Sequence, residues 1–412
     1  RSTSRTLSRS RKIARLQSGA TPRTLEICSG CGGLSLGLKR AGFELSAHIE
    51  SDSEAAETYA LNFSGDYPTD SEWAKPRDME AALHRGLYPI LALGLRPLSH
   101  SIFLRRGYRA KPLHASGDKN ALVAGEENAF RNDPRAGLYR RFLQFVEETQ
   151  PLAILIENVP DILNFGGHNV PEDICKTLEI AGYRAGYTIL NAAYFGVPQV
   201  RERLFVVAIA KELDVTPEFP APQHFLDLPK GYEGSRRVAL KYVDSTSRYF
   251  HQIMTPHPTL KRAVGVREAL EDLPRISEHI VAPSIIRGRR LNDMLPYRNP
   301  NNGISAYAFA MRHWPNFETG RMVDGHLVRL TPRDFPIFAR MRNGGDYPHA
   351  RDVAEGMFRE ALSRLGAACV DKRSKAYREL YAGIVPPYDP HKFPNKWWKL
   401  DPSRPSRTLT AH

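Results

Sequence analysis

The feature that most constrains this chain is a regular alternation of strand and helix patterns between residues 24 and 210. Apolar runs typical of strands lie at 24–28, 44–50, 152–159, 184–196 and 203–210, and helical patterns lie at 34–42, 51–63, 137–151 and 173–183. Ser51 or Ser53 is expected to cap the helix 51–63. Strands that alternate with helices form parallel sheets. The pattern therefore predicts an α/β fold with a doubly wound, mostly parallel sheet.

The sequence changes character on both sides of this region. Residues 1–22 contain Ser, Thr and Arg but no acidic residue, which predicts a flexible basic arm, either a phosphate-binding tail or a disordered leader. We expect a catalytic domain over 23–225, ending in a Pro-rich linker, and a smaller irregular domain over 226–412. The chain begins at Arg1 and stops at RPSRTLTAH, so we expect it to be a fragment.

The composition indicates which binding partners and which cellular compartment to expect. The net charge of +13 over 412 residues favours a polyanionic partner, nucleic acid first, although a merely basic protein remains an alternative. The four cysteines, Cys28, Cys31, Cys175 and Cys369, are too few for a disulfide scaffold. No apolar run approaches the roughly 18 residues of a membrane helix, and no secretory signal is visible. We expect a monomeric cytoplasmic protein without a metal site.

A Gly-rich turn joins the first strand to the first helix, in LEICSGCGGLSLGL (25–38). Glycines let the backbone approach a ligand, and the helix start offers free N–H groups. The second strand ends in Glu50, 20 positions after Gly30, where a carboxylate commonly holds a ribose. This pairing indicates a nucleoside-containing cofactor, with a purely structural turn as the alternative. The absence of G-x-G-x-x-G favours adenosylmethionine over a dinucleotide.

Two further motifs place polar side chains beside buried strands. Glu157 and Asn158 follow the apolar run ILI, and a carboxylate there is costly unless it is used or paired. Gln199, Arg201 and Arg203 alternate in QVRER and are predicted to share one face. Paired arginines beside a carboxylate suggest recognition of an anion or a base. The alternatives are a helix cap or salt bridge for Glu157 and a solvated strand edge for the arginines.

Together these motifs, EICSGCGG, Glu50, ENV and QVRER, resemble the cytosine-5 DNA methyltransferases over roughly residues 24–210. The resemblance implies an S-adenosylmethionine-dependent methyltransferase sheet with a target-recognition domain. It also implies transfer of a methyl group to C5 of a cytosine flipped out of double-stranded DNA, in a nucleoid-associated bacterial restriction–modification setting. It assigns Glu157, Arg201 and Arg203 to catalysis. It assigns Cys28, Gly30, Cys31, Gly33 and Glu50 to the cofactor.

The loop that carries the nucleophile departs from the family. The family has a Pro-Cys pair before the ENV strand, whereas here Leu98 follows Pro97 and no cysteine lies between Cys31 and Cys175. A hydroxyl such as that of Ser99 is a poor replacement for a thiolate. Read one base later, the possible codons of RPLSHSIFLRR permit P-C-H-T-P-F-S-S-D. One hypothesis is therefore a frame slip over about residues 90–116, and the other is a diverged, inactive paralogue.

Three functions remain to be compared. The first is a DNA cytosine-5 methyltransferase that is inactive with this sequence because the loop with the nucleophilic cysteine is absent. The second is a catalytically dead relative that binds DNA through its basic second domain. The third, the tRNA-modifying branch of the family, is disfavoured by the long basic region after residue 225. We also expect the chain to stop before the family's closing motifs, despite echoes of them at 328–341 and 382–387.

Overall fold

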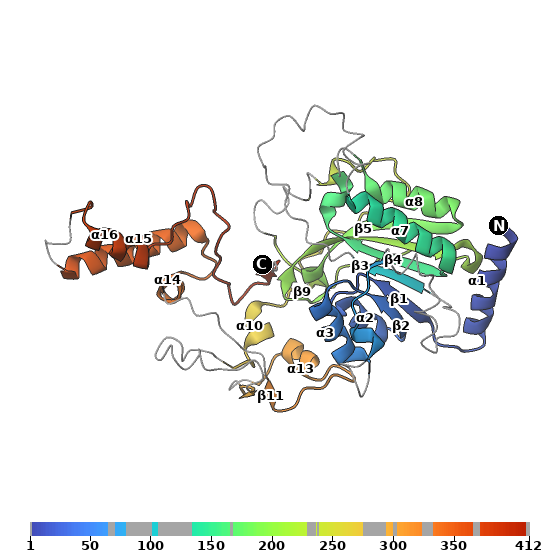
Figure 1. Ribbon diagram of the computed structural model, residues 1–412, viewed down its shortest axis with the longest axis horizontal. Helices are drawn as coiled ribbons and strands as arrows, with labels where there is room; N and C mark the ends of the chain where they lie inside the picture. The colour runs from blue at the N-terminus through green and yellow to red at the C-terminus, as the bar shows by residue number, and fades with distance from the viewer. Residues whose placement is uncertain are drawn as a thin grey trace. The chain divides into compact units, whose positions relative to one another are not determined.

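The computed structural model describes residues 2–64, 71–79, 101–105, 134–164, 168–228, 236, 239–274, 294–299, 303–323, 333–365 and 371–408 (Figure 1). The chain divides into two compact units. The sheet unit comprises Arg1–Asn191, Glu202–Gln223 and Asp227–His257, and the second unit comprises Ala192–Arg201, His224–Leu226 and Pro258–His412. The division differs from the expected boundary at residue 225, because residues 227–257 belong to the sheet unit and the short segment 192–201 belongs to the second unit.

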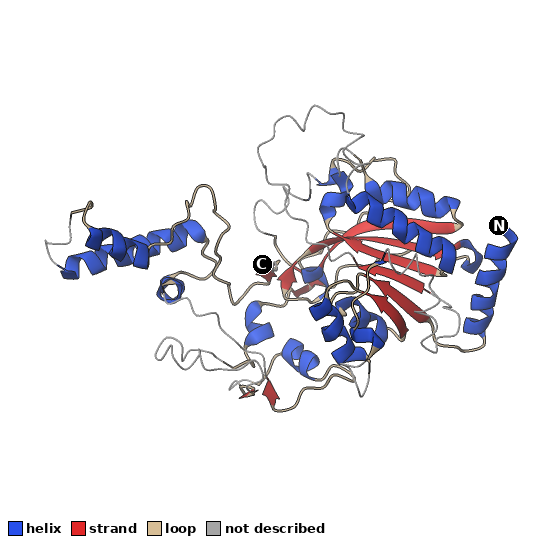
Figure 2. Cartoon of the chain, viewed as in Figure 1, coloured by secondary structure: helices blue, strands red, loops and turns tan. Residues whose placement is uncertain are grey.

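A six-stranded sheet forms the framework of the sheet unit (Figure 2). Its strands lie in the order β2 (Glu44–Ile49), β1 (Arg23–Ile27), β3 (Ser101–Arg105), β4 (Ala153–Asn158), β7 (Glu202–Ala210) and β5 (Tyr183–Asn191). Neighbours from β2 to β4 pair in parallel, whereas β7 is antiparallel to both β4 and β5. Among these six strands only β7 is reversed. The predicted α/β class is therefore present as a mixed sheet.

The helices of the sheet unit follow the predicted pattern closely. They are α2 (Gly33–Arg40), α3 (Ser53–Phe63), α7 (Pro134–Thr149) and α8 (Val170–Ile180), with the 3-10 helices η1 (Glu72–Ala74), η2 (Pro160–Asn164), η3 (Ala192–Phe195, in the second unit) and η4 (Lys211–Leu213). The predicted cap of α3 is wrong. Asp52 is the cap, because its carboxylate accepts the Ala55 N–H at 2.8 Å while Ser53 is already helical.

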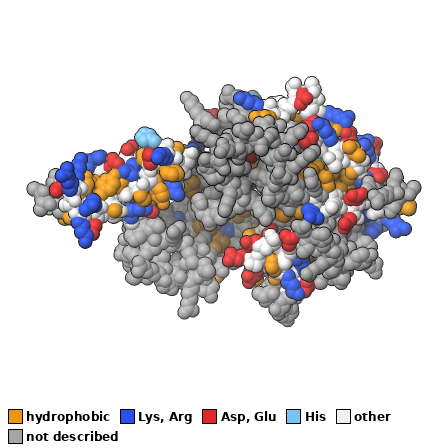
Figure 3. All heavy atoms as spheres, turned by 45° about the horizontal axis from the view of Figure 1, so that its top comes forward, with side chains coloured by type: hydrophobic (Ala, Val, Ile, Leu, Met, Phe, Trp, Pro, Cys, Tyr) orange, Lys and Arg blue, Asp and Glu red, His pale blue; other side chains and the backbone are white. Residues whose placement is uncertain are grey.

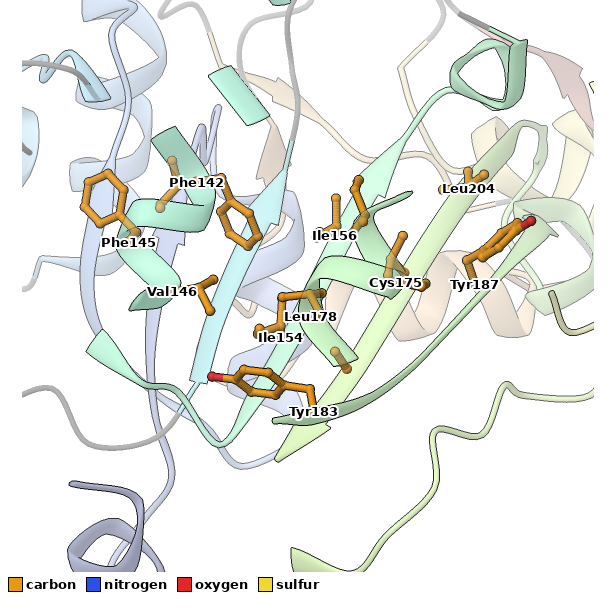
Figure 4. Close-up of a cluster of buried hydrophobic side chains, with 14 of the residues drawn as sticks. Phe142, Phe145, Val146, Ile154, Ile156, Cys175, Leu178, Tyr183, Tyr187 and Leu204 are labelled. Atoms are coloured by element: carbon orange, nitrogen blue, oxygen red, sulfur yellow. The ribbon is translucent and has the colours of Figure 1, made fainter. Parts of the chain in front are cut away.

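The core lies where α7 and α8 cover the sheet (Figure 4). Phe142, Phe145 and Val146 of α7 are buried at helical spacing, and Ile154 and Ile156 of β4 are buried at strand spacing. Side chains of this kind each stabilise the fold by about 1.5–3 kcal/mol when buried. The two periodicities meet in one cluster, which holds β4 and its carboxyl end in place.

The outer strand β5 is partly covered by residues 249–251. The Tyr187 N–H donates to the Tyr249 carbonyl at 2.7 Å, and the His251 N–H donates to the Tyr187 carbonyl at 2.9 Å. Gly186 permits this approach, since a Cβ there would lie 2.6 Å from the His251 ring. The segment satisfies backbone groups that an exposed sheet edge would leave open to association.

The N-terminal residues differ from the expected flexible arm, because Ser2–Gln17 form helix α1. Arg9 and Lys12 of this helix are buried. The Arg9 guanidinium donates to the carbonyls of Ala181 and Gly182 at 3.0 and 3.2 Å, just beyond α8, and pairs with Glu212 at 3.2 Å. A helix C-terminus carries partial negative charge, so these cations stabilise a docked helix that composition alone could not predict.

The second unit has its own hydrophobic core. Its elements are β6 (Gln199–Val200), β8 (His224–Phe225), β9 (Lys261–Arg262), α10 (Val266–Leu270), β10 (Leu295–Pro296), α13 (Ala306–Arg312), β11 (Met322–Val323), α14 (Asp334–Arg340), α15 (Tyr347–Leu365), α16 (Lys375–Ile384) and β12 (Ser406–Arg407). Buried Ile337, Tyr347 and Phe358 bring α14 and α15 together, and the partly buried Tyr377 and Trp397 pack against them. The expected irregular domain thus contains an ordered helical core.

Basic side chains are spread along the α15–α16 hairpin, among hydrophobic and acidic ones (Figure 3). Exposed members of this basic hairpin surface are Arg359, Arg364, Lys372, Arg373, Lys375 and Arg378. Of the helices in the described residues, none combines the length and apolarity needed to cross a membrane.

Candidate active site at the carboxyl edge of the sheet

The carboxyl ends of β1, β2, β3 and β4 share one edge of the sheet because these strands are parallel. The chain runs from β1 outward to β2 and then returns past β1 to β3. Open α/β sheets bind their ligands at the edge where such a reversal occurs. The reversed strand β7 begins at this edge, since Leu204 lies opposite Asn158 at the end of β4.

The Gly-rich turn between β1 and α2 has a constrained backbone. Cys28, Gly30 and Gly32 all have positive φ, at 57°, 56° and 87°. A Cβ at Gly32 would lie 2.3 Å from the Phe63 ring, so this position requires glycine. Cys28 has a side chain in the same left-handed region, which stores local strain. We call residues 28–33 the cofactor loop, after the role that their sequence predicts.

The carboxylate of Glu50 contacts the cofactor loop directly. The Glu50 carboxylate accepts the Gly30 N–H at 2.7 Å with Oε2 and the Asp52 N–H at 2.9 Å with Oε1. A carboxylate has about four lone-pair positions, so two acceptor positions remain for a ligand hydroxyl. The Cys28 N–H also donates to the Ile49 carbonyl at 2.7 Å, which ties the loop to the end of β2.

A buried polar network lies beneath the cofactor loop, and the sequence interpretation missed it. The Ser35 hydroxyl contacts the Glu26 carboxylate and lies 2.7 Å from the Tyr59 hydroxyl. Burial, followed by the Glu26 charge, raises the pKa of Tyr59, so its hydroxyl stays protonated and donates to Ser35. Neighbouring His48 contacts Ser29 of the loop at 2.9 Å. Nothing in the local pattern marks these side chains as partners.

Glu157 and Arg203 form the second cluster at this edge. Arg203 Nε lies 2.9 Å from Glu157 Oε1, and both side chains are mostly buried. Glu157 is the last but one residue of β4 and Arg203 is the second residue of β7, and the antiparallel register brings them together. The ion pair fixes the direction of the carboxylate, which leaves a positioned acceptor at the edge. The salt bridge given above as the alternative for Glu157 is present, with Arg203 as its partner.

Glu202, between the two arginines, is a buried carboxyl that the sequence interpretation passed over. Burial raises its pKa, against the opposing effects of Arg236 and Asn191. Arg236 Nη1 lies 3.6 Å from Glu202 Oε1. The predicted alternation is present in the burial pattern: Gln199, Arg201 and Arg203 are partly exposed, whereas Val200, Glu202 and Leu204 are buried.

Arg201 belongs to the second unit rather than to the sheet unit. Its carbonyl accepts the Ala192 N–H at 2.9 Å. The preceding strand β6 pairs in parallel with β12, and the Thr408 hydroxyl donates to the Val200 carbonyl at 2.8 Å. Residues near the end of the chain therefore support the QVRER segment.

The expected nucleophile position, Leu98, lies outside the described residues, as do Ser99 and His100. Strand β3 begins at Ser101, so residue 98 precedes that strand along the chain. A residue that shared the edge of Glu157 would instead follow Arg105, because β3 and β4 are parallel. Along the chain, position 98 therefore comes before β3 and not after it.

The described cysteines offer no replacement nucleophile next to Glu157. Cys28 and Cys31 belong to the cofactor loop, and Cys175 is fully buried in the core, where burial raises the pKa of its thiol. Within the described part of the chain, no three His, Cys, Asp or Glu side chains are grouped to hold a metal ion.

Comparison with known proteins links this geometry to one family. The family described as C-5 cytosine-specific DNA methylase matches residues 22–82 and 123–291. A protein of Oceanobacillus iheyensis named as a type II methyltransferase is 32% identical over 402 residues, covering 95% of this chain and 82% of its own. The type II methyltransferase M.AgeI of Thalassovita gelatinovora is 27% identical over 411 residues, covering 95% and 84%.

Solved structures give a more distant comparison. A prophage-encoded protein of E. coli, described as a DNA modification methyltransferase, matches with a TM-score of 0.46 at 19% identity, covering 79% of this chain and 76% of its own.

Proposed function

The chain belongs to the family of C-5 cytosine-specific DNA methylases, and from this premise we propose how its sheet unit and second unit serve that activity. The enzymes of this family are DNA (cytosine-5) methyltransferases. The proposed reaction moves a methyl group from S-adenosylmethionine to C5 of a cytosine flipped out of double-stranded DNA. The observation that carries the proposal is the bond between Glu50 and Gly30, which joins a strand-end carboxylate to a Gly-rich loop.

The cofactor loop and Glu50 fit S-adenosylmethionine. When bound, this cofactor supplies an electrophilic methyl group on a sulfonium. Glu50 would accept from the ribose hydroxyls with its remaining lone pairs. The positive φ values at Gly30 and Gly32 let the backbone approach the ligand. α2 starts with Gly32 as its cap and no side-chain acceptor there, so backbone N–H groups face this end.

Glu157 and the arginines of QVRER would hold the cytosine. The Glu157 carboxyl group, oriented by Arg203 at 2.9 Å, would hold the N3 edge of the base and favour addition at C6. Arg201 and Arg203 would steady the flipped base, as the family resemblance implies. Extracting a base from the stack costs roughly a few kcal/mol, so the pocket needs groups that are already oriented.

We propose that the chain as written lacks turnover. The reaction needs a thiolate that adds to C6, so that C5 becomes nucleophilic, and then leaves after the C5 proton is removed. Leu98 cannot supply it. The family match omits residues 83–122, which enclose Leu98 and the suspected frame slip at about 90–116. This local break within a matching domain supports a damaged copy, and it equally permits a dead paralogue that binds DNA.

A repaired gene tests these alternatives. Restoring the frame over about residues 90–116 recreates the P-C-H-T-P-F-S-S-D loop, while Leu98→Cys alone leaves the rest of the loop wrong. With labelled S-adenosylmethionine and mixed-sequence DNA, we expect methylation only from the repaired chain. Sequencing the gene in several independent clones is the second experiment. An intact reading frame with a Leu codon at position 98 in all of them contradicts the frame slip and favours the paralogue. Methylation by the chain as written contradicts its proposed inactivity.

The basic hairpin surface of the second unit is the proposed contact with DNA phosphates. Its exposed arginines and lysines match the sequence-independent charge recognition that positions proteins on a duplex. The Trp398 ring lies under the Arg407 guanidinium, 3.4 Å away, and is therefore engaged in a contact within the chain.

We further propose helices on both faces of the sheet, a monomeric state, and action in the bacterial cytoplasm at the nucleoid, all as the sequence predicted.

A further inference from the structure

Ser29 is an internal residue of the cofactor loop, although the loop lies at the edge of the sheet. Its side chain is fully buried, and its backbone carbonyl accepts the Gly32 N–H at 3.1 Å. The hydroxyl has two acceptors in range: His48 Nδ1 at 2.9 Å and the Gly30 carbonyl at 3.5 Å. The second distance is too long to compete. Ser29 is therefore held by His48.

The other contact of His48 determines which atom donates. His48 Nε2 lies 2.8 Å from the Trp73 carbonyl, which has no proton to give. Nε2 must carry the proton, which leaves Nδ1 of the neutral ring as an acceptor for the Ser29 hydroxyl. His48 thus bridges the cofactor loop to η1.

The His48 ring is held firmly between its two hydrogen bonds. It stacks on Tyr59 with ring centroids 3.8 Å apart and an interplanar angle of 8°. Tyr59 contacts Ser35, which lies in the first turns of α2. Both sides of the loop are therefore anchored on one stack: Ser29 through His48 and Ser35 through Tyr59.

We propose that His48 is a positioning residue that sets the cofactor loop in the shape that accepts its ligand. His48 acts through Ser29 and does not touch the cofactor. This inference rests on the proposed function for the identity of the ligand. The orientation of the Gly30 N–H toward Glu50 depends on the loop shape, so loss of the Ser29 contact would disturb the carboxylate that holds the ribose.

Two substitutions separate the two hydrogen bonds of the ring. In His48→Asn the amide oxygen occupies the place of Nδ1 and still accepts from Ser29, but the bond to Trp73 is lost. In His48→Gln the amide nitrogen occupies the place of Nε2 and still donates to Trp73, but Ser29 loses its acceptor. Both variants lose the ring that stacks on Tyr59, so stacking is matched between them.

Affinity for the S-adenosylmethionine analogue sinefungin, measured by titration calorimetry, is the first readout. We expect His48→Gln and Ser29→Ala to weaken binding about tenfold, the value of one buried hydrogen bond, and His48→Asn to weaken it less than about threefold. Adding Ser29→Ala to His48→Gln should cost little more, because the two single changes break the same contact.

Hydrogen exchange of the loop amides in the ligand-free chain is the second readout. We expect faster exchange over residues 28–33 in His48→Gln and Ser29→Ala than in His48→Asn. Equal exchange and equal affinity in the Asn and Gln variants would overturn the proposal. If the wild-type chain fails to bind sinefungin, the proposed function is contradicted, but hydrogen exchange of the loop amides still tests whether His48 positions the loop. Ser29→Ala removes one oxygen atom, so it provides the same test should both His48 variants fail to fold.

Discussion

Acidification should weaken the sheet unit through His48. Its side chain is 3% exposed, and burial, with a smaller contribution from Arg77, lowers the pKa to about 4 from 6.5, although the Trp73 carbonyl opposes this. Between these values the unfolded chain binds a proton at His48 that the folded chain does not. Stability is therefore lost as the pH falls through this window. The loss attributable to this group is about 2 kcal/mol near pH 5 and about 3 kcal/mol below about pH 4.

The assay is urea unfolding of wild type, His48→Asn and His48→Gln at about pH 7 and about pH 5. Carboxyl groups titrate in the same range, but their contribution cancels when the pH effects of two chains are compared. We expect wild type to lose about 2 kcal/mol more than either variant on acidification. Gln252→Ala, a change at an exposed residue of the same unit that carries no titratable group, should behave as wild type. Equal losses in wild type and both His48 variants would refute the reasoning.

Three further predictions concern other parts of the molecule. Arg9→Ala should lower the free energy of unfolding by about 2 kcal/mol in urea titrations, because Glu212 and two carbonyls lose a buried partner, while Arg11→Ala on the exposed face should change it by less than about 0.5 kcal/mol. Gly32→Ala should lower the free energy of unfolding by about 2–4 kcal/mol, because the added Cβ clashes with Phe63 and the backbone φ is 87°. Gly37→Ala adds a Cβ with no atom within 4 Å and should be neutral or stabilising, and equal effects of the two changes would contradict the assigned clash. Arg378→Ala should weaken DNA binding similarly for all sequences, and the slope of log binding constant against log salt concentration should become smaller by about 1. An unchanged slope would show that Arg378 of the hairpin does not contact DNA phosphates.

Local patterns predicted α2, α3, α7, α8 and five strands of the sheet because each has a strong period, whereas β3 and α1 were not predicted. The buried spacing of Phe142, Phe145 and Val146 is visible in the sequence. The spacing from Gly30 to Glu50 predicted that both serve one ligand, and the structure brings the two residues into contact. In these cases the side chains involved belong to adjacent elements, and the short connection between them limits where they can lie.

The remaining features depend on contacts between distant segments. The buried position of Arg9 depends on carbonyls beyond α8, so a run of basic residues looked like a solvated arm. The His48 network depends on η1, which no periodicity marks. The cap of α3 was misassigned between two serines because Asp52 is equally suitable and only the backbone decides. The separation of Arg201 from Arg203 into different units has no sequence signal.

The reversed direction of β7 has an evolutionary consequence. Glu157 and Arg203 are brought together by the register of two adjacent strands, with Glu157 opposite Phe205. The chain between the two strands, residues 159–201, does not set the distance between Glu157 and Arg203. Insertions or deletions in that stretch can therefore accumulate in relatives without moving the pair. A one-residue slip of β7 against β4 would send Arg203 to the opposite face of the sheet. We expect lineages to differ in the length of this stretch and to agree in this register.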